Sequence, residues 1–380
     1  MDLSFLRPLY QRSGPYASVY LDMTRTTEEA PKAPQLRWRG LREELAAQGA
    51  PPETMRAVDD VVGQELDRRW SGGLAVFAAG GQVVLSERMA EAPRRPMAHL
   101  APLPHVLPLL AQRGEQVPHL VAVVDRTGAD ISCVSAEGER ETFDVRGDAD
   151  YPMTKVSAGD WNQARFQRAA EETWRTNAKK VGHQVEQAAR RFGPEVVVIA
   201  GDVRARTAVI EELPTSVLER AAEAGAAPRA AGAGPQALDA EVARLVELKS
   251  TEHIVAAVAR FEEERGNRRR AAEGLGPVVA ALRRGQVDTL LLEDQPDVVA
   301  RLWVGPDSTH VAVLADDLRA LGVEDMTEDR ADAALIRALT GTDGDLLVVP
   351  SGGLRAEAGV GAVLRYVDAS TEGEQSTEGD

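Results

Sequence analysis

Apolar and polar residues repeat along the chain with two different periods, and each period predicts one kind of element. Apolar residues that recur every three or four positions predict helices over residues 34–48, 52–70, 164–191, 204–214, 236–265, 269–285 and 328–341. Shorter apolar runs predict strands over residues 18–23, 72–79, 82–87, 119–125, 129–135, 140–145, 193–202, 286–293, 345–350 and 359–367. Nearly continuous apolar runs followed by crossover helices indicate an α/β protein, with a mixed α+β unit at the N-terminus.

Changes in composition divide this pattern into three predicted domains and a tail. Residues 1–115 form an α+β domain that ends in a proline-rich stretch, and residues 116–266 form a second domain. Residues 267–367 form an α/β domain, and the acidic residues 368–380 form a tail that is expected to be disordered. Within the second domain, residues 146–163 are predicted to form an irregular loop. The Ala/Gly-rich residues 221–237 are predicted to form a flexible connection.

The tripeptide Gly80-Gly81-Gln82 lies between two of the predicted strands. Gly-Gly-Gln is also the tripeptide that class-1 peptide release factors place in the catalytic centre of the ribosome. A Gly-Gly pair between strands is a hairpin signal, because a tight primed turn needs positive φ at both central residues. We therefore expect Gly80 and Gly81 to form a turn, and Gln82 to open the second strand.

Composition excludes several kinds of site. The formal net charge of −16 argues against general coating of nucleic acid but leaves room for a local basic patch. Cys133 is the single cysteine, so neither an intramolecular disulfide nor a cysteine-built zinc site is expected. No window reaches 18 apolar residues, which favours a cytoplasmic protein without a membrane partner. The histidines lack metal-ligand spacing and no phosphate-cradling loop is present, so we assign no metal, cofactor or catalytic residue.

The predicted helix over 164–191 departs from the acidic character of the chain. Segment 161–191 holds seven basic and three acidic residues. On a helical wheel the face opposite the apolar residues carries Arg165, Arg168, Arg175 and Lys179. This pattern is typical of the solvated face of an amphipathic helix, and it is also what a surface for RNA phosphates requires. The predicted helix is preceded by Trp161, Asn162 and Gln163. An aromatic ring can stack on unpaired RNA bases, and side-chain amides can form hydrogen bonds with them.

The order of these segments resembles the archaeal and eukaryotic class-1 release factors and Pelota. The similarity covers residues 118–367 through the strand ending in Val-Val-Asp, the "ARF" that opens the basic helix, "VVVIAGD", "GPVVAALRRGQVDTLLLED" and the closing "AGVGAVLRYV". The motifs "GPYASVYLDMTRTTEEA", "DRTGADI", "AGDWN" and "AGDVRART" resemble the bacterial branch of this superfamily. That branch includes the ribosome hibernation factor Balon and actinobacterial dormancy proteins.

The resemblance implies a ribosome-binding protein that occupies the vacant A site of idle ribosomes and blocks translation during stress or dormancy. Elongation factor Tu is a further partner that the resemblance implies, and no DNA partner is expected. Residues expected to contact ribosomal RNA are Lys155, Trp161, Asn162, Gln163, Arg165, Arg168, Arg175 and Lys179.

Peptidyl-tRNA hydrolysis is not expected, because the segment that corresponds to the catalytic loop of release factors holds no Gly-Gly-Gln. That segment is residues 155–166, where Gly159 and Gln163 are separated by three residues. Asp160 and Trp161 are bulkier than glycine and would crowd the approach to the ester.

Two other functions remain open from the sequence. The first is a release or rescue factor that hydrolyses peptidyl-tRNA with Gln163 as a displaced catalytic amide. The second is a soluble stress protein whose basic face binds something other than the ribosome.

Overall fold

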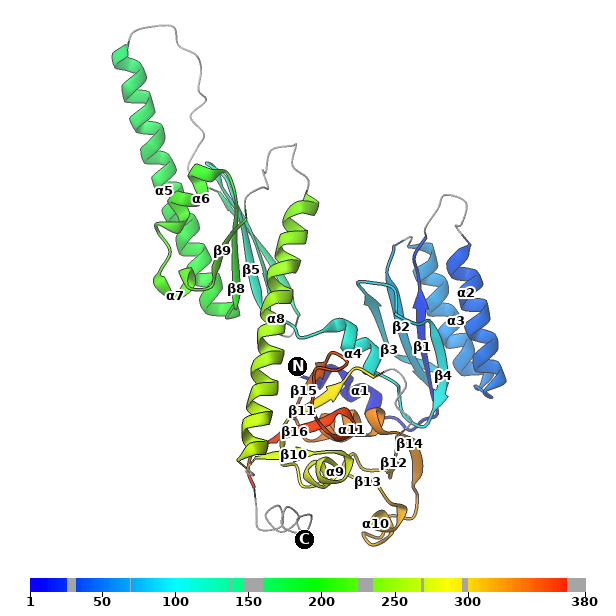
Figure 1. Cartoon of the computed structure of the whole chain (residues 1–380). Coiled ribbons are helices and arrows are strands. Elements are labelled where there is room, and N and C mark those ends of the chain that lie inside the picture. The colour runs from blue at the N-terminus through cyan, green and yellow to red at the C-terminus, as the bar shows by residue number, and fades with distance from the viewer. Residues whose placement is uncertain are drawn as a thin grey trace. The chain divides into compact units, whose positions relative to one another are not determined.

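The computed structural model describes residues 1–25, 32–68, 70–136, 138–146, 160–224, 235–267, 270–295 and 300–367, and side chains are described in all of these except residues 160–171 and 235. The chain forms two compact units (Figure 1). One unit combines Met1–Gly114 with Ile254–Asp380, and the other is Glu115–His253. The first unit therefore contains both the first and the third domain of the sequence-based division.

The Glu115–His253 unit is built on a five-stranded sheet in the order β7-β6-β5-β8-β9. The strands are β5 (His119–Val124), β6 (Gly128–Val134), β7 (Arg140–Arg146), β8 (Val196–Gly201) and β9 (Ala221–Ala224). β5 pairs parallel with β8 and antiparallel with β6. β5 and β8 are apolar along nearly their whole length, because helices cover both faces of the sheet.

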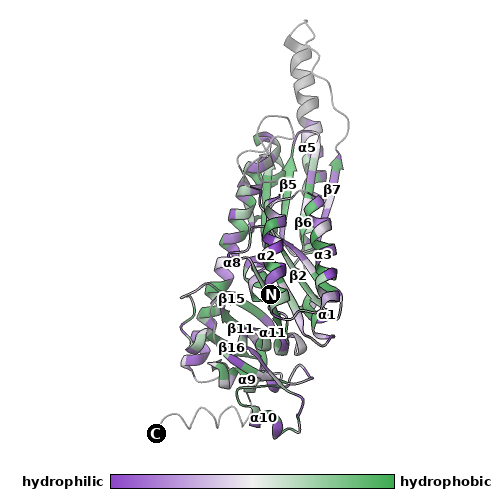
Figure 2. Cartoon of the chain, turned by 90° about the vertical axis from the view of Figure 1, so that its right-hand side faces the viewer, coloured by the Kyte–Doolittle hydropathy of each residue, from purple (hydrophilic) through white to green (hydrophobic). Residues whose placement is uncertain are grey.

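One face of this sheet is covered by α5 (Asp160–Phe192), α6 (Val203–Ile210) and α7 (Thr215–Leu218). The other face is covered by the first half of α8 (Pro235–Gly266), through Leu238 and the partly buried Val242 and Leu245. In Figure 2, β5 is mostly hydrophobic, whereas the edge strand β7 carries many hydrophilic residues. Among the described residues, no helix has the length and apolar character needed to cross a membrane.

The N-terminal part of the other unit is an antiparallel sheet in the order β3-β2-β1-β4. Its strands are β1 (Tyr16–Asp22), β2 (Gly73–Ala79), β3 (Gln82–Met89) and β4 (Met97–Ala101). Alternate residues of β1 point to opposite faces, so Val19 packs with α2 (Ala33–Ala47) and α3 (Pro52–Asp67), while Tyr20 joins a second core. Short helices η1 (Ser4–Leu6), α1 (Arg7–Tyr10) and α4 (Leu107–Arg113) contribute to that second core.

The C-terminal part of the same unit contains two smaller sheets. One has the order β10-β16-β11-β15, with strands Ala271–Glu273, Val360–Leu364, Val287–Glu293 and Asp345–Val349. The other has the order β13-β12-β14, with strands Val311–Ala312, Arg301–Val304 and Thr327–Arg330. The helical elements are α9 (Leu275–Arg283), α10 (Ala315–Arg319), α11 (Ala331–Gly341) and the single turn η2 (Glu357–Gly359).

A single core cluster joins the two ends of the chain within this unit. It includes Tyr20 and Phe77 from the N-terminal sheet together with Leu282, Leu290 and Ile336 from the C-terminal part. A buried polar group crosses the same boundary. The carboxylate of Asp332 accepts two hydrogen bonds of 3.0 Å from Arg330 and lies 3.4 Å from Nε2 of His105.

The α/β class and most of the predicted elements are confirmed. The pattern predicts no element over residues 301–319, where the structure has β12, β13 and α10. Residues 221–224 were predicted to be a flexible connection, but they form β9 because pairing with β8 outweighs their composition. Residues 160–163 belong to α5 rather than to an irregular loop. The proline-rich stretch contains β4 and α4. The predicted helices over 269–285 and 328–341 begin with strands, namely β10 and the end of β14, and residues 368–380 lie outside the described part.

Removal of the Asp332 carboxylate should destabilise the unit at its internal boundary. Burial alone raises the pKa of this carboxyl, but hydrogen bonds from His105 and Arg330 hold the pKa well below its usual value. Asp332→Ala is expected to lower the free energy of unfolding by about 3 kcal/mol at pH 7, because the charge of Arg330 loses its buried partner. Urea unfolding monitored by fluorescence measures the loss.

The pH dependence follows from the lowered pKa. The contribution of Asp332 is fully present above the unfolded-state pKa of about 4 and declines as the pH falls below it. The difference between wild type and variant should therefore be smaller at pH 3 than at pH 7. Asp316→Ala is the control, because the Asp316 side chain is 85% exposed in its pair with Arg319. A difference that does not change with pH would contradict the role of the ionised carboxylate.

Candidate nucleic-acid interface

The Gly-Gly-Gln tripeptide forms a tight hairpin in the first unit. Ala79 at the end of β2 pairs with Gln82 at the start of β3, and the two glycines between them have φ values of 56° and 75°. The Gly81 N–H donates a hydrogen bond to Oγ1 of Thr54 at 3.1 Å. Oε1 of Gln82 accepts one from the Arg12 guanidinium at 2.8 Å. The prediction of a hairpin turn is confirmed, and the tripeptide belongs to a different unit from α5.

The basic face of α5 can be followed from residue 172 onward. Val181 and Val185 are buried against the sheet, whereas Arg175 and Lys179 are exposed on the other side of the helix. Of the residues predicted to contact RNA, these two have described side chains. The others on α5 are placed only as helical positions, namely Trp161, Asn162, Gln163, Arg165 and Arg168, and Lys155 lies outside the described residues.

Arg175 and Lys179 differ from other cations of the same helix in their pairing. Further along α5, Arg190 forms an ion pair with Glu186 at 2.6 Å, and Arg191 forms one with Glu141 at 2.8 Å. Within the described part of the chain, neither Arg175 nor Lys179 has a carboxylate within ion-pair distance. Their charges are available to an external anion.

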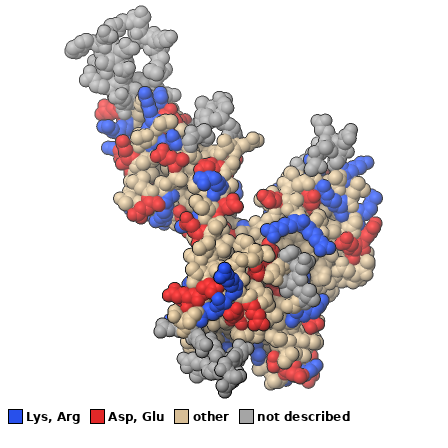
Figure 3. Space-filling view, viewed as in Figure 1, with Lys and Arg blue, Asp and Glu red and all other residues tan. Residues whose placement is uncertain are grey.

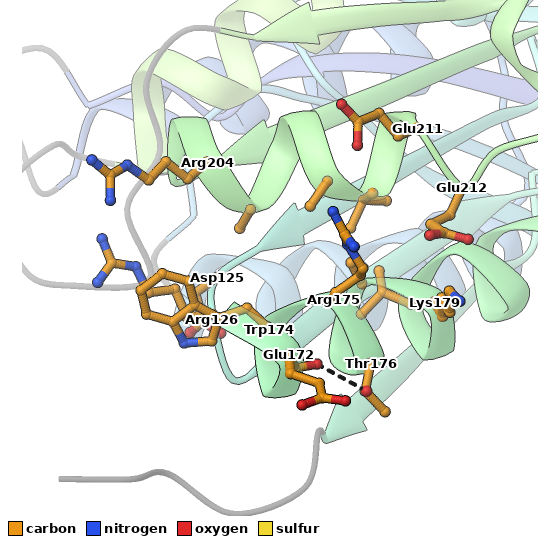
Figure 4. Close-up of a pocket in the computed structure, with 15 residues that line it drawn as sticks. Asp125, Arg126, Glu172, Trp174, Arg175, Thr176, Lys179, Arg204, Glu211 and Glu212 are labelled. Atoms are coloured by element: carbon orange, nitrogen blue, oxygen red, sulfur yellow. Dashed lines mark hydrogen bonds between the residues drawn. The ribbon is translucent and has the colours of Figure 1, made fainter. Parts of the chain in front are cut away.

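A pocket of about 580 Å³ lies between α5 and α6 and includes both of these cations (Figure 4). Two further arginines line it, Arg126 from the turn after β5 and Arg204 from the first turn of α6. The sequence analysis missed both. The signal that could have found them is that β5 and β8 are parallel neighbours, so the residues that follow them meet at one edge of the sheet.

Arg126 is held in place by α5. Its guanidinium lies 4.5 Å from the centroid of the Trp174 ring, and its carbonyl oxygen accepts a hydrogen bond from Nδ2 of Asn177 at 3.0 Å. Such a cation–π contact fixes the guanidinium while leaving its N–H groups free to donate. Asp202 caps α6 by accepting from the N–H groups of Arg204 and Ala205, both at 3.0 Å, and lies 3.9 Å from Arg126.

The face of this unit seen in Figure 3 carries basic and acidic side chains side by side. Acidic residues also line the pocket, namely Asp125, Glu172, Glu211 and Glu212. The site is therefore suited to local contacts with individual anionic groups. It is less suited to long-range attraction of a polyanion, which needs a broad field of one sign.

The one cysteine of the sequence, Cys133, is buried. Burial raises the pKa of the Cys133 thiol to about 11, so the thiol stays protonated near neutral pH. No group of three or more His, Cys, Asp or Glu residues with metal-binding geometry occurs among the described residues.

Comparison with known proteins gives the family. A family model described as bacterial archaeo-eukaryotic release factor family 2 matches residues 118–267. The protein Rv2629 of Mycobacterium tuberculosis strain H37Rv, which carries the description uncharacterized, is 33% identical over 371 residues, covering 95% of this chain and 96% of its own. The chain belongs to the bacterial archaeo-eukaryotic release factor family. The same identity and coverage are found for MT2704 of M. tuberculosis strain CDC 1551, also described as uncharacterized.

Solved structures similar to this family member include three archaeal proteins. The archaeal translation termination factor aRF1 has a TM-score of 0.26 at 17% identity, covering 95% of this chain and 96% of its own. Archaeoglobus fulgidus Pelota has a TM-score of 0.32 at 13% identity, covering 77% and 80%. Archaeal Pelota in a ribosome-bound model with ABCE1 has a TM-score of 0.36 at 14% identity, covering 96% and 94%.

The hairpin assignment of the glycines can be tested by substitution. Gly81→Ala is expected to lower the free energy of unfolding by about 1–2 kcal/mol, because an L-residue is strained at this positive φ. A Cβ atom there would also lie 3.1 Å from Cγ of Glu53. Gly40→Ala in α2 is the matched control, since a Cβ there meets nothing within 4 Å and a helix favours alanine. Equal stability of Gly81→Ala and wild type in urea unfolding would contradict the assignment.

Proposed function

We propose that this release-factor-like protein is a ribosome-binding hibernation factor that occupies the A site of idle ribosomes and inhibits translation without hydrolysing peptidyl-tRNA. Membership of the release factor family supports a role in translation. One of the similar structures is described as ribosome-bound Pelota, which supports the ribosome as the partner.

We infer the absence of hydrolysis from the position of the one Gly-Gly-Gln in the sequence. It closes a hairpin in which the Gly81 N–H and the Gln82 amide are already bonded within the protein. A catalytic amide must instead be presented to the ester on a loop that can approach it closely. The segment before α5, where release factors carry the tripeptide, has none.

Cations on the second unit supply a means of binding ribosomal RNA. Arg175, Lys179 and Arg204 are exposed and have no ion-pair partner in the described part of the chain. Arginine grips phosphate through two parallel hydrogen bonds, and lysine acts as a point charge. Residues 155–168 would extend this contact toward the peptidyl-transferase centre, with Trp161 stacking on a base. Elongation factor Tu is the second partner that we propose.

Ribosome binding should depend on salt through these cations. Cosedimentation with vacant 70S ribosomes is expected to weaken steeply as salt rises. The double variant Arg175→Gln/Lys179→Gln should reduce the slope of log affinity against log salt by about one to two, since each phosphate contact contributes about 0.7–0.9. Arg190→Gln/Arg191→Gln is the control, because both residues lie on the same helix and are already paired, Arg190 with Glu186 and Arg191 with Glu141 of β7. An unchanged slope in the first variant would show that Arg175 and Lys179 do not contact the phosphates of ribosomal RNA.

Hydrolysis separates this proposal from a release or rescue factor. We expect no release of peptide from ribosome-bound peptidyl-tRNA above the spontaneous rate, with wild type or with Gln163→Ala. Gln82→Ala is the control for the hairpin, and it should leave both ribosome binding and this background rate unchanged. Release that wild type supports and Gln163→Ala abolishes would establish the enzyme instead.

A further inference from the structure

Six of the charged side chains that line the pocket between α5 and α6 form no ion pair with another described residue. Arg175, Lys179 and Arg204 share the pocket with Glu172, Glu211 and Glu212. None of these six side chains forms an ion pair within the part of the chain that the structure describes. Opposite charges that were placed only for stability would be expected to neutralise one another. Their separation leaves both donors and acceptors free for a ligand.

The arginines at one end of the pocket are separated from the glutamates at the other. Figure 4 shows Arg126 and Arg204 together beside Trp174 and Asp125 at one end, and Glu211 and Glu212 near the other end, where Lys179 also lies. Because a helix rises about 1.5 Å per residue, Arg204 and Glu211 at the two ends of α6 are separated by about 10 Å along the axis. The pocket therefore suits a molecule of that length with an anionic group at one end and hydrogen-bond donors at the other.

The space between these ends is lined on one side by apolar residues. Ala178, Val181 and Val209 line it as buried residues, and Ala205 and Ala208 add small side chains from α6. Arg175 rises from α5 toward α6 between the two ends (Figure 4). A guanidinium plane above a small apolar surface is an arrangement on which a nucleobase can stack.

We propose that this pocket binds a nucleoside monophosphate unit, either free or as an unpaired nucleotide of RNA. Arg126 and Arg204 donate to the phosphate, and the guanidinium of Arg175 stacks on the base. Glu211 and Glu212 accept hydrogen bonds from the exocyclic amino group of the base. Carboxylates can only accept, so cytosine, adenine and guanine are preferred over uracil, which has no exocyclic amino group and whose one ring donor, N3–H, lies between two carbonyl oxygens that repel the carboxylates.

Contacts within the protein fix the guanidinium of Arg126 in the position from which it would donate to the phosphate. Trp174 holds its guanidinium and Asn177 holds its backbone, so little side-chain freedom is lost on binding. The volume of about 580 Å³ lies within the range of small-molecule sites. The inference goes beyond the proposed function, because free nucleotides can be bound without a ribosome.

Isothermal titration of the full-length protein with CMP and UMP tests the proposal. We expect CMP to bind with one-to-one stoichiometry and at least about fivefold more tightly than UMP. AMP and GMP should also exceed UMP. Absence of binding for all four nucleotides at millimolar concentration would overturn the proposal, as would equal affinity for CMP and UMP.

Variants locate the binding. Arg204→Gln should weaken all four nucleotides by about tenfold, because a charge-assisted contact to phosphate is lost. Glu211→Ala/Glu212→Ala should abolish the preference for CMP over UMP while UMP binding is retained. Arg190→Gln, which lies on α5 outside the pocket and is paired with Glu186, is the control and should bind as wild type does. Nucleotide binding that neither pocket variant changes would place the site elsewhere and overturn the proposal.

Two further measurements identify the source of the nucleotide and separate this proposal from the function proposed above. Tighter binding of a short cytidine oligoribonucleotide than of CMP would identify RNA as the source, and weaker or equal binding would identify a free nucleotide. Both outcomes support the pocket. Wild-type protein that binds CMP but does not cosediment with ribosomes would refute hibernation alone. Cosedimentation without binding of any nucleotide would refute the pocket alone.

Discussion

Burial of one side of α5 against the sheet of the Glu115–His253 unit fixes the chemistry of that unit. Val181, Val185 and Ala188 pack on the apolar residues of β5 and β6, and this contact sets the rotation of the helix about its axis. A helix that rotated by one residue would bury a cation or expose this apolar row. Arg175 and Lys179 therefore face outward as a necessity of packing, and the same constraint carries Trp174 to the side where it meets Arg126.

The parallel pairing of β5 with β8 is the second constraint on the site. It brings the turn after β5 and the start of α6 to one edge of the sheet, although they are separated by more than 70 positions in the chain. Asp202 serves both, since it caps α6 and approaches Arg126 at 3.9 Å. The pocket is thus bounded by α5, by α6 and by the turn after β5, and the strand order makes the last two neighbours.

The sequence predicts features that depend on local periodicity, and it misses those that depend on contacts between distant segments. The exposed face of α5 and the glycine hairpin follow from spacing and from backbone preference, so Arg175 and Lys179 were found in advance. Arg126 and Arg204 were not, because neither stands out until β5 and β8 are paired. For the same reason the composition of Ala221–Ala224 predicts a connection, because its strand propensity is weak and its pairing with β8 is not visible in the sequence.

The tight turn at Gly80 and Gly81 shows that a Gly-Gly-Gln tripeptide does not by itself identify a catalytic loop. In this chain both glycines supply left-handed backbone for a corner between neighbouring strands, and the amide that follows is occupied by an arginine. A search for the tripeptide alone would group this hairpin with the catalytic loops of release factors. Requiring that the tripeptide precede a long cationic helix, instead of a second strand, would separate the two kinds of site.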